Sequence, residues 1–252
     1  MPSTRQRDTI SSIILQTPSL AQFTVDSSTR IATLWSNYGS IDRVRLRSKS
    51  TSGSKAGSGC TVIVKTVAPP GLKTGDQADE GHLRKLLSYE VERFFYANLS
   101  SRLPGQAKVA HFHPPRQKGD EDGVTRVQIV LEDLAVEYPD PARGSLNLED
   151  SKSVLSWLAT FHGTFWGLQH EQDIRSTFVL PPLQHKGGNT AGVWEQGTYW
   201  YLDTRREELE STDEQQYRWL LEWLDKVWAT EWIFGLLTGR TSGRRSTQER
   251  DK

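Results

Sequence analysis

The sequence has little of what marks several classes of protein. It contains one cysteine, Cys60, which excludes a framework of internal disulfides and suits a reducing compartment. No apolar run in the 252 residues approaches the length of a membrane-spanning helix. Basic and acidic side chains balance at 31 each, so no excess of positive charge points to nucleic acid. We therefore expect a cytoplasmic protein that binds neither membranes nor nucleic acid.

Patterns of apolar and polar residues predict a mixture of strands and helices. Expected strands are 41–46, 61–67, 108–112 and 126–134. Expected helices are 88–99, a helix that begins after Asn147 as its N-cap, and a tryptophan-rich amphipathic helix at 214–234. The second helix carries an apolar stripe from Val154 to Phe165 that is expected to face a core, with His162 on it. The third is expected to need a partner surface, such as a second copy of the chain.

A lysine and a glutamate stand out within this pattern. Lys65 ends the apolar strand that begins at Thr61, and the following helix carries Glu92 close to its core-facing aromatic residues. Glu90 is expected to point elsewhere, into solvent. A lysine oriented by a carboxylate in this way can hold the phosphates of a nucleotide. The alternative is an ordinary strand whose terminal lysine extends to solvent.

Five segments in the same order resemble the small-molecule kinases of the choline kinase and aminoglycoside phosphotransferase type, in particular their CHK-type, ecdysteroid-kinase-like branch. They are LWSNYGSI (34–41), TVIVK (61–65), SYEVERFFY (88–96), IVLEDL (129–134) and WEQGTYWYLDTR (194–205). The resemblance implies a two-lobed, protein-kinase-like α+β fold. A small lobe of antiparallel strands and one helix would occupy 29–135, between a flexible lead-in (1–28) and a partial helical large lobe (136–237), with a disordered tail at 238–252.

The same resemblance implies roles for individual residues in binding ATP. Lys65 would hold the phosphates and Glu92 would orient Lys65, while Tyr38 and Gly39 would belong to a loop over the nucleotide. The remaining assignments are Glu132 and Leu134, at a hinge that binds the base. From the residues alone, the segment around Tyr38 and Gly39 could equally be a plain hairpin.

One departure from the family concerns its chemistry. The family deprotonates its hydroxyl substrate with the Asp of a His-Gly-Asp loop and binds Mg²⁺ through a later Asn and Asp, but this chain has no His-Gly-Asp sequence. We therefore expect no catalytic residue, no metal ligand and no phosphoryl transfer in a chain that ends before that loop. Three interpretations stay open: the N-terminal part of an ATP-dependent small-molecule phosphotransferase, a catalytically dead kinase-like module that binds nucleotide or protein, and an unrelated α+β protein.

Overall fold

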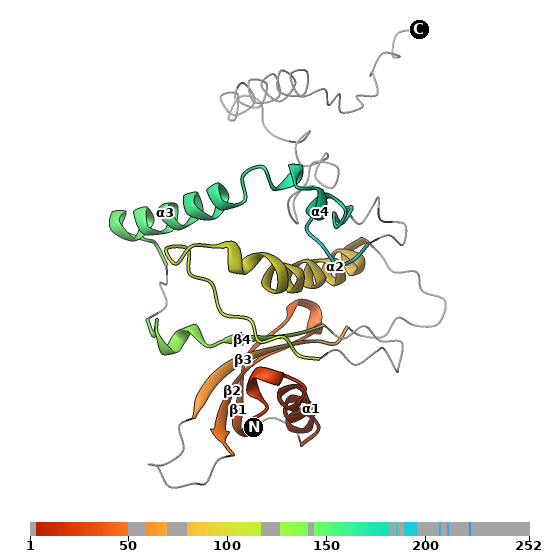
Figure 1. Ribbon diagram of the computed structural model, residues 1–252, viewed down its shortest axis with the longest axis vertical. Helices are drawn as coiled ribbons and strands as arrows, with labels where there is room; N and C mark the ends of the chain where they lie inside the picture. The colour runs from red at the N-terminus through yellow and green to blue at the C-terminus, as the bar shows by residue number, and fades with distance from the viewer. Residues whose placement is uncertain are drawn as a thin grey trace. The chain divides into compact units, whose positions relative to one another are not determined.

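The structure is a computed structural model (Figure 1). It describes residues 4–49, 59–69, 80–116, 127–140, 144–181, 185 and 189–195, and singly Glu207, Ser211 and Glu222. The chain divides into two compact units, Met1–Gly197 and Thr198–Lys252, and every helix and strand named below belongs to the first. Of the helix expected at 214–234 only Glu222 is described, and the tail at 238–252 lies outside the described residues.

A four-stranded antiparallel sheet is the centre of the first unit, which confirms the α+β class (Figure 1). Its strands are β1 (Phe23–Thr33), β2 (Gly39–Ser48), β3 (Cys60–Val67) and β4 (Gln128–Glu132), and they lie side by side in this order. Lys65 pairs with Ile41 on one side and with Ile129 on the other. These three side chains therefore share one face of the sheet.

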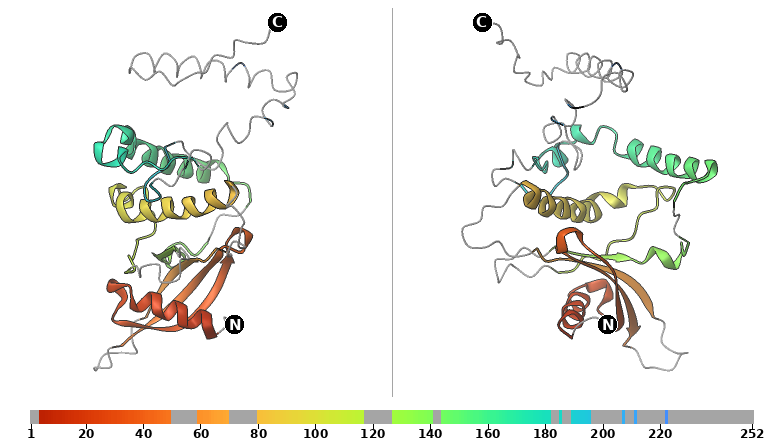
Figure 2. Two further views of the ribbon diagram at one scale, coloured as in Figure 1. Left: turned by 90° about the vertical axis from the view of Figure 1, so that its right-hand side faces the viewer. Right: turned by 180° about the vertical axis from the view of Figure 1, so that it is seen from behind.

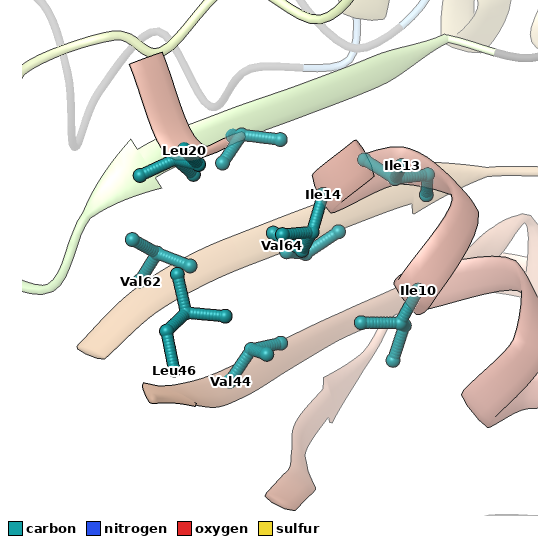
Figure 3. Packing of buried hydrophobic residues seen from close by; sticks show 9 residues of the cluster. Ile10, Ile13, Ile14, Leu20, Val44, Leu46, Val62 and Val64 are labelled. Atoms are coloured by element: carbon teal, nitrogen blue, oxygen red, sulfur yellow. The ribbon is translucent and has the colours of Figure 1, made fainter. Parts of the chain in front are cut away.

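One face of the sheet is covered by α1 (Thr4–Leu15). Ile10, Ile13 and Ile14 follow helical spacing and pack against Val44 and Val64 (Figure 3). This corrects the expectation of a flexible lead-in over 1–28, where the structure has α1 and the first half of β1. The reason is that the valines of β2 and β3 on this face must be shielded from water. The three isoleucines of α1 shield them, although the N-terminal segment is mostly polar.

The opposite face carries α2 (Glu80–Phe94), as all three ribbon views show (Figures 1 and 2). Leu86 and Tyr89 pack against a cluster that includes Val67 and Ile129. The helix begins eight residues before the expected start at 88, and a π-helical turn, Phe95–Leu99, continues it. Because strand residues alternate between faces, β3 directs Val62 and Val64 toward α1 and directs Lys65 toward α2.

The prediction of a strand at 108–112 is wrong. Among the described residues it forms only one isolated bridge, from Phe112 to Leu131, and His113 N–H donates to Val130 O at 2.8 Å. Pro114 and Pro115 follow immediately, and because proline has no N–H the ladder along β4 cannot continue.

The helix α3 (Leu148–Thr164) begins where expected, because the N–H of Asp150 donates to Oδ1 of Asn147 at 2.8 Å. Its apolar stripe is only partly buried. Phe161 packs against Phe95 of the π-helical turn, whereas Leu155 is 63% exposed. His162 is also exposed, which corrects the expectation of a core histidine. The short helix α4 (Gln172–Arg175) follows. In the part of the chain that the structure describes, no helix combines the length and the apolarity that crossing a bilayer requires.

Candidate functional site

Lys65 and Glu92 form the ion pair that the sequence predicts. Nζ of Lys65 donates to Oε2 of Glu92, and the two side chains are 13% and 33% exposed. The same ammonium lies 4.7 Å from the centre of the Tyr89 ring, within the range of a cation–π contact. Tyr89 and Glu92 are three residues apart on α2, so they share the helix face that looks at β3. The lysine is thus fixed from two directions.

The turn between β1 and β2 is fastened to the start of α2. Tyr38 Oη lies 2.6 Å from His82 Nδ1, and Lys85 Nζ donates to Ser36 Oγ at 3.2 Å. Lys85 also lies 4.8 Å from the centre of the Tyr38 ring. Ser36 and Asn37 both have positive φ angles, 53° and 60°, which makes the turn tight. Tyr38 itself is buried in the cluster between the sheet and α2.

Gly39 has a structural reason to be glycine. Its φ is +146°, and a Cβ at this position would lie 1.9 Å from the carbonyl oxygen of Thr66 on β3. The carbonyl carbon of Thr66 at 3.0 Å and the Cα of Val67 at 3.1 Å would also be too close for an ordinary contact. The close approach of β2 and β3 therefore excludes any side chain here, whether or not a ligand binds.

Four polar residues of α2 form one stripe: His82, Lys85, Tyr89 and Glu92. Their spacing of three, four and three residues places all of them on one side of the helix. Sequence patterns alone did not identify His82 and Lys85, because the expected helix began at 88. The same spacing, followed backward from Glu92, would have found both, provided the helix was extended to Glu80.

The expected hinge residues lie at another place in the sheet. Glu132 pairs with Val62, three residues along β3 from Lys65, or about 10 Å at the rise of a strand. Its carboxylate accepts a hydrogen bond from the N–H of His111 at 3.0 Å and forms an ion pair with Lys108. Both contacts lower the pKa of Glu132, and the hydrogen bond from His111 has the larger effect. Leu134 begins the 3₁₀ turn Leu134–Val136. Neither side chain contacts Lys65 or Glu92 in the described contacts.

A second ion pair, not predicted from the sequence, lies on the same face of the sheet as Lys65. Nε of Arg43 is 2.8 Å from Oδ2 of Asp133, a buried carboxylate that also accepts from the N–H of Ala135. Arg43 pairs in register with Ile63, two residues before Lys65, which places its side chain toward α2. The pair ties the segment after β4 to the middle of the sheet.

The site has cations but no cluster of metal ligands among the described residues. In the described part of the chain, no three or more His, Cys, Asp or Glu side chains lie together in a way that could hold a metal ion. His111 and His113 have ring centres 4.9 Å apart, and burial together with the charge of His111 lowers the pKa of His113. Among the described residues, the surroundings of Lys65 offer an ammonium but no set of ligands for Mg²⁺.

Comparisons with known proteins return no match from protein-family models, from curated proteins or from solved structures.

Proposed function

We propose that residues 29–135 bind ATP as the small lobe of a protein-kinase-like phosphotransferase for a small-molecule hydroxyl. The observation that carries the proposal is the ion pair between Lys65, on a central strand, and Glu92, on the helix that crosses it. An ammonium held in this way is oriented before a ligand arrives, so it binds phosphate oxygens without first losing its own freedom. The single cysteine agrees with a cytoplasmic setting.

The surroundings of Lys65 support a role in binding over a role in stability. Its neighbours in the row across the sheet, Ile41 and Ile129, are both apolar and belong to the cluster under α2, so the position itself does not require a charged residue. Removing a lysine and a glutamate from water is unfavourable, and such pairs often contribute no net stability. A charged pair at this position is therefore better explained by a ligand that needs the cation.

The residues present fit the phosphates of ATP. Lys65 would contact phosphate oxygens, and Glu92 would keep its ammonium in place. The turn 35–37, fastened to α2 through Tyr38 and Lys85, lies at the same end of the sheet and would limit the space for the nucleotide. The described residues do not fit Mg²⁺, so no step through the metal is proposed.

Binding of ATP to the purified chain, measured by isothermal titration calorimetry, tests the proposal. Lys65→Met is expected to weaken binding roughly 10- to 100-fold, the effect of losing a charge-assisted hydrogen bond to phosphate. Lys152→Met is the matched control, because Lys152 is an exposed lysine on α3 that pairs with Glu149. No binding by the unsubstituted chain, or equal binding by the Lys65 variant, would overturn the proposal.

Phosphoryl transfer by this chain is not expected. Without a His-Gly-Asp sequence, it has no assigned carboxylate to accept the proton of a hydroxyl substrate. Incubation with radiolabelled ATP and choline, aminoglycosides or steroid alcohols should give no phosphorylated product. Turnover that is abolished by Lys65→Ala would contradict this expectation.

A further inference from the structure

Lys85 differs from the other cations of α2 in what it binds. Arg84 pairs with Glu80, and Arg93 pairs with Glu90 at 2.8 Å, so both arginines have an acidic partner on their own helix. The ammonium of Lys85 has no carboxylate within ion-pair distance among the described residues. It instead reaches across to the β1–β2 turn, where its only described hydrogen bond is to the neutral Oγ of Ser36.

We propose that Lys85 is a second phosphate-binding cation, which contacts the terminal phosphate of the nucleotide while Lys65 holds the inner ones. This inference rests on the proposed function. The hydroxyl of Ser36 accepts from Lys85 and keeps its own proton, which it can donate to a phosphate oxygen. A cation and a hydroxyl donor at one point make a site for an anion of the kind that ends a triphosphate.

The position of Lys85 along the polar stripe of α2 supports the assignment of the two lysines to different phosphates. Lys85 and Glu92 are seven residues apart, so their Cα atoms lie about 10 Å apart along the helix. The Lys65 ammonium is at the Glu92 end, and the Lys85 ammonium is at the Ser36 end. Two cations at the two ends of one stripe can contact different phosphate groups of the same chain.

A purely structural role for Lys85 would duplicate a contact that already exists. The turn is fastened to α2 by Tyr38, whose ring is buried and whose hydroxyl lies 2.6 Å from His82. By comparison, a hydrogen bond between a lysine and an exposed serine adds little, because both groups are well solvated when apart. Loss of the Lys85 charge also removes its contact with the Tyr38 ring, but the ring stays buried and held by His82, so the fold should remain intact.

Titrations of ATP, ADP and AMP into the full chain separate the two lysines. Lys85→Met is expected to weaken ATP binding about tenfold, ADP less, and AMP not at all. Lys65→Met should weaken ATP and ADP alike. Lys85→Arg should retain the preference for ATP, because it keeps the positive charge. Ser36→Ala, at an exposed position, should reduce that preference in part, and it serves as a second variant if Lys85→Met does not fold.

Three other results of these titrations would each overturn a different part of the two proposals. If Lys85→Met binds ATP like the unsubstituted chain while Lys65→Met is weakened, the role of Lys85 is wrong and the proposed function stands. A loss that is equal for ATP, ADP and AMP would mean that Lys85 acts only through the structure of the turn, which also overturns the inference. Failure of the unsubstituted chain to bind any of the three nucleotides overturns both proposals.

Discussion

The substitution Gly39→Ala tests the close approach of β2 and β3. The added Cβ would lie 1.9 Å from the carbonyl oxygen of Thr66 and 3.1 Å from the Cα of Val67. Both are backbone atoms, so no side chain can rotate away to relieve the contact. The strands would have to separate by about 1.5 Å at this end before the contact became ordinary.

The cost follows from what this separation disturbs. The N–H of Ala68 donates to Tyr38 O at 2.7 Å beside the contact, and weakening this bond costs about 1 kcal/mol. Alanine at a φ of +146° adds backbone strain, of about 1–3 kcal/mol. The free energy of unfolding should therefore fall by about 2–4 kcal/mol. The corresponding decrease in melting temperature is roughly 4–16 °C for a chain of this size.

Thermal unfolding followed by circular dichroism measures this effect, with two glycines as controls. A Cβ on Gly105 or on Gly144 would meet no atom within 4 Å, and of these two only Gly144 has a positive φ, +76°. Gly105→Ala should change stability by less than about 0.5 kcal/mol, and Gly144→Ala should lower it by about 1–2 kcal/mol. If Gly39→Ala unfolds at the same temperature as Gly105→Ala, the argument from strand proximity is refuted.

Three further predictions concern other parts of the first unit. Ile14→Ala should lower the free energy of unfolding, measured in urea, by about 2–5 kcal/mol, because Ile14 is 1% exposed. Leu15→Ala is the control, because Leu15 is 62% exposed and its loss should change the free energy of unfolding little. Equal effects of the two substitutions would argue against the packing of α1 on the sheet. Asn147→Ala should destabilise the chain by about 1 kcal/mol and Asn147→Ser should not, because serine also caps a helix; equal melting temperatures for the two variants would contradict the cap. Burial raises the pKa of the Cys60 thiol, so less thiolate forms near neutral pH, and iodoacetamide should modify it more slowly than free cysteine; an equal rate would show that the thiol is unperturbed.

The ion pair of the candidate site could be predicted because it depends on local patterns. The apolar run before Lys65 identified β3, and the spacing around Glu92 identified the helix face. The N-cap at Asn147 was predictable for the same reason, since a cap depends on neighbours within four residues.

Features that depend on distant partners could not be predicted. The three isoleucines of α1 are buried because they pack against valines of β2 and β3. The sequence alone does not show that these separate segments come together. The stripe of α3 looked like a core face, but only its Phe161 end meets the π-helical turn. One local pair was also missed: Glu90 was expected in solvent, yet it pairs with Arg93 one helical turn away, and the two side chains are 15% and 24% exposed.

The packing of α1 on one face of the sheet has a consequence for how the protein folds during synthesis. The 12 residues of α1 are synthesised before the strands that they cover, and an isolated helix of this length is only marginally stable in water. Its cluster also includes Val130 of β4, which is made after all the other strands. The cluster that stabilises α1 is therefore complete only after β4 has been synthesised, although α1 precedes all four strands in the chain.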